Sequence, residues 1–200
     1  LLEPLAHLDG HAQFGDGPEF RRGAQQSHHD VFAVDGRDHG ETHVDLLGLD
    51  DVAPYPEPVE DQETFAANSL LKARAAHAET GLPSLADDSG LCVAALNGMP
   101  GVLSARWSGL PKSDERNNAL LLDQMLDVPV ARRGAAFECA LAFCYTDELG
   151  ATHELTVSGQ MRGTITDRPV GEGGFGYDVI FVPSDQEGTL TSAQLSPGQK

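Results

Sequence analysis

Residues 86–106 constrain this chain most, because they place two adjacent carboxylates directly after the apolar run 82–85. Consecutive side chains of a strand point to opposite faces, so at a strand end Asp87 can support the backbone while Asp88 faces a cleft. Gly90 would then free the backbone to turn. Carboxylates suit Mg²⁺, which usually takes one or two of them together with substrate phosphates. The pattern predicts a cation-binding strand end, and the alternative is a strand end closed by an Asx turn.

Composition narrows the class of protein. The 200 residues are 40% hydrophobic, which suffices for one domain with a real core. No apolar run of about 18 residues occurs and the first residues do not resemble a signal peptide, so we expect a cytoplasmic protein. Cys92, Cys139 and Cys144 lie in apolar contexts without C-x-x-C spacing. We expect small core residues there, and neither a disulfide framework nor a zinc site.

The charge balance limits the partners. Thirty-one acidic and thirteen basic residues give a formal net charge of -18, which disfavours extended nucleic-acid binding. A small phosphorylated substrate is compatible with this charge if local cations neutralise it. Each of the three lysines, Lys72, Lys112 and Lys200, is therefore informative. The alternative explanation of the acidic excess is solubility.

Residues 1–43 differ from the remainder of the chain. They contain six of the eight histidines among many Gly and Asp residues, without helical or strand periodicity. We interpret residues 1–43 as a divergent leader, disordered or non-native, in which the apolar run 31–34 forms at most one edge strand. Residues 44–200 are predicted to form the folded domain.

The segment after the proline-punctuated loop 54–58 is predicted to be a helix. Asp61 is the expected N-cap and Gly81 stands where a C-cap glycine belongs. Asn68 and Lys72 recur at helical spacing on a stripe with apolar neighbours. A lysine there either has a function or extends along the apolar surface with its charge in water.

The remaining pattern alternates strands and one more helix. Residues 114–127 are predicted to be helical, and residues 91–96 form a short strand or turn. Residues 135–145 and 153–159 form a hairpin whose second strand continues through 161–165, and a last strand covers 179–182. This alternation is typical of an α/β fold.

A glycine-rich stretch, G-E-G-G-F-G-Y-D, precedes that last strand. Glycine lets the backbone approach a ligand closely, and the aromatic rings of Phe175 and Tyr177 could stack on a base. The alternative is a flexible turn that carries two core aromatics.

Together these pieces resemble the inosine/xanthosine triphosphate pyrophosphatase family over about residues 44–200. Five motifs carry the resemblance in order: T-F-A-A-N-S-L-L-K-A-R, L-A-D-D-S-G-L, N-G-M-P-G-V-L-S-A-R-W-S-G, N-N-A-L-L-L and G-G-F-G-Y-D-V-I-F-V-P. The resemblance implies an elongated α/β fold with a mixed central sheet, flanking helices and a cleft between two lobes, usually in a homodimer. It also implies Mg²⁺-dependent hydrolysis of ITP, dITP and XTP to the monophosphate and pyrophosphate.

The resemblance also assigns roles to single residues. It implies that Asp88 is the proton acceptor and a metal ligand, that Glu60 shares the metal, and that Lys72 is the catalytic helix lysine. The residues that it implies for substrate binding are Ser89, Phe175, Gly176, Tyr177, Asp178 and Lys200.

Two parts of the family's pattern are not matched. The first strand and its S/T-x-N-x-x-K phosphate loop have no counterpart that we find in residues 1–43, and the serine-histidine-arginine motif is missing. A catalytically impaired nucleotide-binding or dimerisation remnant of the family is therefore the alternative function. The related septum-associated nucleotide pyrophosphatases rank last because they lack F-G-Y-D.

Overall fold

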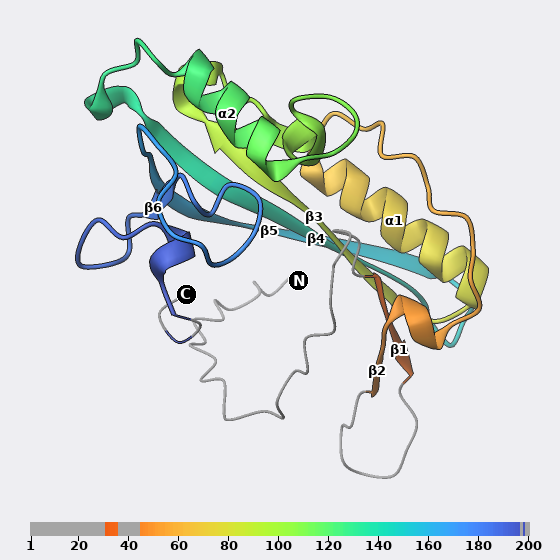
Figure 1. Ribbon diagram of the computed structural model, residues 1–200. Helices are drawn as coiled ribbons and strands as arrows, with labels where there is room; N and C mark the ends of the chain where they lie inside the picture. The colour runs from red at the N-terminus through yellow and green to blue at the C-terminus, as the bar shows by residue number, and fades with distance from the viewer. Residues whose placement is uncertain (1–30, 36–44, 197, 199–200) are drawn as a thin grey trace, which may run out of the picture.

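The computed structural model describes residues 31–35, 45–196 and 198 (Figure 1). Six strands form one sheet in the order β2-β1-β3-β4-β5-β6. The strands are β1 (Val31–Asp35), β2 (Asp45–Leu47), β3 (Ser84–Val93), β4 (Gly134–Thr146), β5 (Thr152–Ile165) and β6 (Phe181–Pro183). The helices are α1 (Phe65–Thr80) and α2 (Asp114–Gln124), with 3-10 turns at Leu49–Asp51, Ala94–Leu96, Gly101–Arg106, Val130–Arg132 and Ser192–Gln194.

Both helices lie on one side of the sheet, and the loops around β6 lie on the other (Figure 1). This arrangement confirms the predicted α/β class. The five strand pairs of the described residues are all antiparallel, so the expected mixed pairing does not occur among them. The turn 147–151 between β4 and β5 is too short for the crossover that a parallel pair needs.

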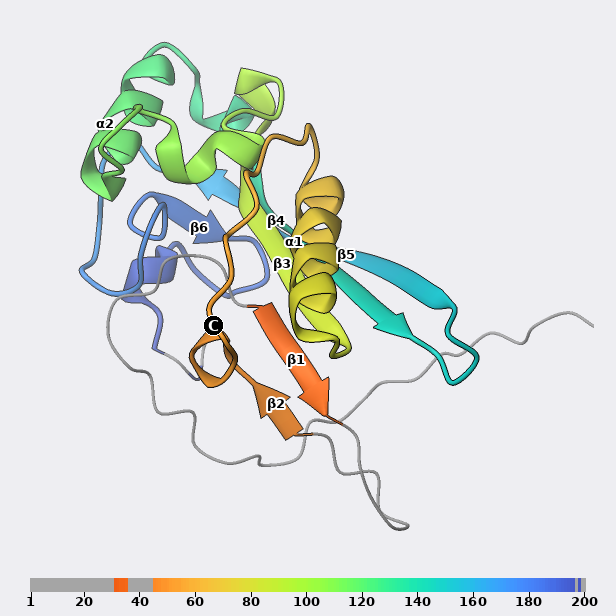
Figure 2. The same ribbon diagram turned by 90° about the vertical axis from the view of Figure 1, so that its right-hand side faces the viewer.

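Strand β1 departs from the expectation for residues 31–34. It lies between β2 and β3 and pairs with both, so the prediction of an edge strand was wrong (Figure 2). The run 45–47 supplies the additional pairing partner and itself becomes the edge. Most of the proposed leader 1–43 lies outside the described residues, and its boundary stays a prediction.

The aspartate pair lies inside β3, not at its end as predicted. Asp87 is opposite Leu141 and Asp88 is opposite Ala140 on β4. The strand continues because its backbone pairs with β4 over its whole length, and because Leu91 and Val93 are completely buried beyond the carboxylates.

Gly90 does not turn the chain, contrary to the prediction, because it too pairs within β3. A Cβ atom at this position would lie 2.5 Å from Ser104 Oγ and 2.6 Å from the Gly101 carbonyl oxygen. The glycine therefore allows the Gly101–Arg106 turn to pack directly on the strand.

Helix α1 begins at Phe65 and not after Asp61. Thr64 is the N-cap, because its hydroxyl accepts a hydrogen bond from the Ala67 N–H at 3.2 Å. Gly81 caps the other end with a φ of 71°, as predicted. Helix α2 ends at Gln124, slightly before the predicted 127.

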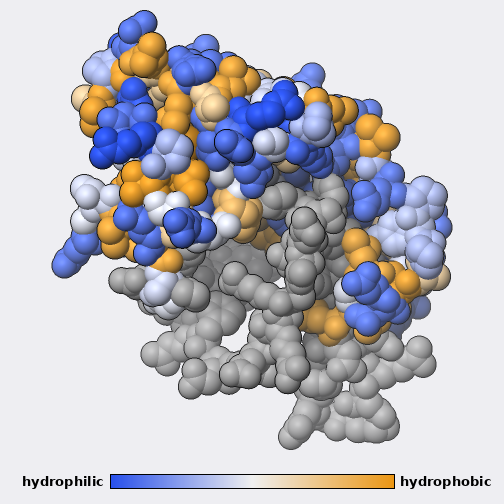
Figure 3. All heavy atoms as spheres, viewed as in Figure 1, coloured by the Kyte–Doolittle hydropathy of each residue, from blue (hydrophilic) through white to orange (hydrophobic). Residues whose placement is uncertain are grey.

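The core has two parts. In the smaller part, small residues of α1 pack against small residues of β3 and β4. The helix contributes Ala73 and Ala76, and the strands contribute Ala86, Ala142 and Cys144. The larger cluster joins β3, α2 and the segment before β6, and it consists of Leu91, Val93, Leu121, Met125, Ile165, Tyr177, Ile180 and Phe181. Over α1 and α2 the surface mixes hydrophilic and hydrophobic residues (Figure 3). Among the described residues, no helix combines the length and the apolar character needed to cross a membrane.

Candidate active site

The candidate site is a cleft of about 620 Å³. Strands β3, β4 and β5 line it with residues 88–91, 137–139 and 159–161. The Gly101–Arg106 turn contributes residues 104–106, and the glycine-rich loop contributes residues 174–178. The two most informative motifs of the sequence therefore face one cavity, although they lie far apart along the chain.

A buried ionic cluster adjoins this cleft, and two of its members, Glu60 and Asp88, line the cleft wall. The ammonium of Lys72 lies 2.7 Å from Glu60 Oε1 and 3.5 Å from Asp88 Oδ1. The Lys72 side chain is 4% exposed, so its charge is not in water and the snorkelling alternative does not apply. We call Glu60, Lys72 and Asp88 the ionic cluster.

Asn68 connects the cluster to the loop before α1. Its Oδ1 accepts a hydrogen bond from the Gln62 N–H at 3.1 Å, and its Nδ2 donates to Asp88 Oδ2 at 3.1 Å. Because a backbone N–H can only donate, the amide of Asn68 must present its NH₂ group to Asp88. Asn68 is 1% exposed, so this orientation is locked by packing.

The two oxygens of Asp88 thus face two donors, the Lys72 ammonium and the Asn68 amide. Burial raises the pKa of the Asp88 carboxyl above its usual value, and these two donors offset part of that rise. A carboxylate with a raised pKa is a stronger base, which suits a group that accepts a proton from water.

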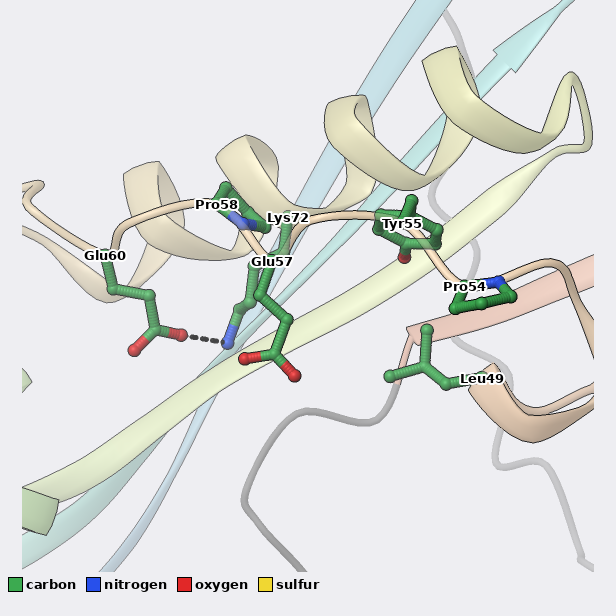
Figure 4. Close-up of a pocket in the computed structure, with 7 residues that line it drawn as sticks. All are labelled: Leu49, Pro54, Tyr55, Glu57, Pro58, Glu60 and Lys72. Atoms are coloured by element: carbon green, nitrogen blue, oxygen red, sulfur yellow. Dashed lines mark ion pairs between the residues drawn. The ribbon is translucent and has the colours of Figure 1, made fainter.

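Arg106 holds the loop that carries Glu60. One N–H of its guanidinium donates to the Glu60 carbonyl oxygen at 3.3 Å. Glu60 and Lys72 also line a second cavity, of about 190 Å³ (Figure 4). The side chains of Glu57 and Glu60 both point toward the Lys72 ammonium there.

The ionic cluster has the donor chemistry for a divalent cation. Glu60 and Asp88 converge on one point of positive charge, and hard carboxylate oxygens suit Mg²⁺. In the described part of the chain, no group of three or more His, Cys, Asp or Glu side chains could hold a metal by itself. A pair is enough, because Mg²⁺ usually takes one or two carboxylates when substrate phosphates complete its coordination.

The glycine-rich loop forms another part of the cleft wall. The Gly176 N–H donates to Asp114 Oδ2 at 2.7 Å, and Asn118 Nδ2 donates to the Gly176 carbonyl at 2.8 Å. Phe175 is 65% exposed. Tyr177 is 4% exposed and its hydroxyl donates to the Ser104 carbonyl at 2.9 Å. Of the two aromatics, Phe175 is therefore the more exposed.

Most of the residues predicted for the site line the cleft. These are Glu60, Asp88, Ser89, Phe175, Gly176, Tyr177 and Asp178. Lys72 lies behind the wall and contacts Glu60 and Asp88, while Lys200 lies outside the described residues.

Three further residues line the cleft although we predicted no role for them, and they are Arg106, Lys112 and Glu138. Arg106 stands within one of the five motifs, and that position was the signal available for it. Cys139 was expected in the core, but it is exposed on the cleft wall because its partner in the next strand is Gly159, which has no side chain to cover it. Cys144 is buried as expected.

Comparison with known proteins places this geometry in a family. The profile of the Ham1 family matches residues 32–200. The chain belongs to the Ham1 family. This confirms the resemblance on which the site residues were chosen.

Relatives within the Ham1 family are close in sequence. The chain is 56% identical over 163 residues to a dITP/XTP pyrophosphatase of Nocardia farcinica, covering 82% of this chain and 76% of that protein. It is 55% identical over 161 residues to the enzyme of the same name from Mycolicibacterium paratuberculosis, covering 80% and 76%.

Solved Ham1-family structures share the fold. A nucleoside-triphosphatase, also named dITP/XTP pyrophosphatase, from Mycobacterium abscessus has a TM-score of 0.65 at 50% identity and covers 76% of each chain. The Ham1 protein of Staphylococcus aureus has a TM-score of 0.64 at 40% identity, covering 70% of this chain and 69% of its own.

Proposed function

We propose that this chain hydrolyses deaminated purine nucleoside triphosphates, ITP, dITP and XTP, to the monophosphate and pyrophosphate in the presence of Mg²⁺. The observation that carries the proposal is one cleft whose wall contains Phe175 together with Glu60 and Asp88 of the ionic cluster. The names of the relatives support the same activity.

Asp88 is the proton acceptor in this proposal. It lines the cleft, and the Asn68 amide and Lys72 ammonium fix the direction of its carboxylate. A carboxylate so placed orients an attacking water and takes its proton, a contribution of roughly 10² to 10⁴ in rate. Glu60 and Asp88 would hold Mg²⁺, which supplies charge neutralisation on the phosphates when bound.

Recognition of the base is assigned to the glycine-rich loop. Phe175 offers a ring face for stacking, which is worth about 1 to 3 kcal/mol per base. Inosine and xanthine present an acceptor at the six position where adenine presents an amine donor. A buried donor of the protein that faces this amine has no acceptor for its hydrogen bond. The cost is about 1 to 3 kcal/mol, and it favours the deaminated bases.

The test is pyrophosphate release from ITP, dITP, XTP and ATP by the purified 200-residue chain with Mg²⁺. We expect pyrophosphate, and not inorganic phosphate, from the first three substrates and much less from ATP. Equal rates for ATP and ITP, or release of inorganic phosphate, would contradict the proposal.

A catalytically impaired remnant is the second candidate, and the charge of the cleft favours it. Among the described residues, the cleft is lined by six carboxylates and two cations. The cations are Arg106 and Lys112, and the carboxylates are Glu60, Asp88, Asp114, Glu138, Asp178 and Asp185. A triphosphate carries about four negative charges, so without enough cations it would bind weakly. Nucleotide binding without turnover in the same assay would support this candidate.

We also infer that the chain forms a homodimer and works in the cytoplasm without a nucleic-acid or membrane partner. The net charge of -18 supports the exclusion of nucleic acid. Leu155 and Val157 on β5 are 59% and 64% exposed, which is compatible with a self-association surface.

A further inference from the structure

The Lys72 ammonium contacts the same two carboxylates that would hold Mg²⁺ in the proposed function. It contacts Glu60 Oε1 at 2.7 Å and Asp88 Oδ1 at 3.5 Å. The two carboxylate side chains are only 17% and 13% exposed, so water screens these contacts poorly. A buried ammonium requires such counter-charges, and two neighbouring carboxylates require a cation.

We propose that Lys72 and a divalent cation compete for Glu60 and Asp88. The ammonium keeps the two carboxylates together and offsets part of their charge, and a metal binds them well only when the ammonium moves away. The inference rests on the proposed function for the identity of the metal site, but it concerns the free protein and not the reaction.

The structure provides room for the displaced ammonium. The cavity of about 190 Å³ is lined by Lys72 itself, Glu57 and Glu60 (Figure 4). The four-carbon stem of a lysine is flexible, so the ammonium can shift while α1 stays in place. The carboxylate of Glu57 lies on this side and can act as the alternative partner of the ammonium.

The competition predicts that one substitution changes the metal affinity in the opposite direction to the usual one. Removing a positive residue from a nucleotide site normally weakens the binding of its ligands. Lys72→Gln should instead tighten the binding of Mn²⁺ to the nucleotide-free chain by about tenfold or more, because the Lys72 ammonium then no longer competes for the two desolvated carboxylates.

The experiment measures free Mn²⁺ by electron paramagnetic resonance in titrations of the full chain without nucleotide. Lys112→Gln is the matched control, because Lys112 lines the cleft but has no ion pair with Glu60 or Asp88, and we expect less than a twofold change. The double variant Glu60→Gln, Lys72→Gln should lose the gain. A gain in Lys72→Gln no larger than in Lys112→Gln, or a weaker affinity, overturns the proposal.

A measurement on the unaltered chain covers the case in which Lys72→Gln does not fold. The three lysines give three side-chain signals in a ¹⁵N-lysine spectrum. Mg²⁺ should shift the Lys72 signal far more than the other two, and an unmoved Lys72 signal at saturating Mg²⁺ overturns the proposal. If the chain fails to hydrolyse ITP while Lys72→Gln still tightens Mn²⁺ binding, the proposed function falls and the competition stands.

Discussion

The adjacent residues Asp87 and Asp88 lie in different surroundings although they share one strand. Asp88 points to the α1 side, where Asn68 and Lys72 contact it. Asp87 is on the other face, within 3.5 Å of the Ser89 hydroxyl, and does not line the cleft. Only one of the two carboxylates is therefore positioned for chemistry.

We predict that Asp88→Asn lowers kcat for ITP by at least about 10²-fold, because the amide keeps the shape but cannot accept a proton. The matched control is Asp87→Asn, which we expect to cost much less. Steady-state kinetics with Mg²⁺ in excess compare the two variants. Equal losses would contradict the assignment of separate roles.

A second prediction concerns Gly90. In Gly90→Ala the new methyl group would meet Ser104 Oγ and the Gly101 carbonyl at 2.5 and 2.6 Å, and backbone cannot move away cheaply. We expect a loss of about 1 to 3 kcal/mol in the free energy of unfolding. Gly159→Ala is the control, because a Cβ on Gly159 meets nothing within 4 Å. Urea titration measures the free energy of unfolding of both variants. Similar midpoints would show that the Gly101–Arg106 turn moves to make room for the methyl group.

The chemistry of single residues was easier to predict than their geometry. Asp88 and Lys72 were recognisable because their residue types stand in motifs with a known role. That Lys72 is buried between two carboxylates was not visible, because Glu60 reaches it only through a loop held by Arg106, 46 residues further along the chain. Such long-range contacts leave no local pattern in the sequence.

At the scale of elements, α1 joins the loop of Glu60 to strand β3. Asn68 makes both connections, to the Gln62 N–H and to Asp88. The helix could be predicted from its composition and from Gly81. Its start could not, because Asp61 and Thr64 are both good caps and tertiary contacts decide between them.

We predict that Asn68→Leu destabilises the fold by about 1 to 3 kcal/mol, because it leaves the Gln62 N–H and one Asp88 oxygen without their partner. It should also lower kcat for ITP more than it changes KM, since the direction of Asp88 is lost. Ser69→Ala is the control on the same helix, because the Ser69 hydroxyl bonds only within α1, to the Ala66 carbonyl. It should leave kcat unchanged, and an equal loss in kcat would make Asn68 a purely structural residue.

At the scale of the whole molecule, the α/β class followed from the alternation of helical and extended patterns. The position of the aspartate pair did not, because two charges in a run normally mark a strand end. Here the sheet tolerates Asp88 inside a strand, since a neighbouring lysine and an amide satisfy it. A functional residue thus broke the local rule that the prediction used.

The proposed homodimer leads to a prediction on β5. Val157→Lys should shift the chain toward the monomer in light scattering, because Val157 is 64% exposed on the apolar part of the strand and a lysine would be desolvated in an interface. Leu149→Lys is the control, 94% exposed in the turn between β4 and β5. Unchanged mass for both variants would place any self-association elsewhere.

The long strand β5 also has a consequence for hydrogen exchange. It pairs with β4 over residues 152–164, whereas β6 covers only 163–165 on its other edge. Within the described residues, the outer edge of 152–162 thus has no strand beside it. Amide groups of an antiparallel strand point alternately to one edge and the other. Protected and rapidly exchanging amides should therefore alternate along β5, so that one continuous strand shows both the slow rates of the sheet interior and the fast rates of a surface loop.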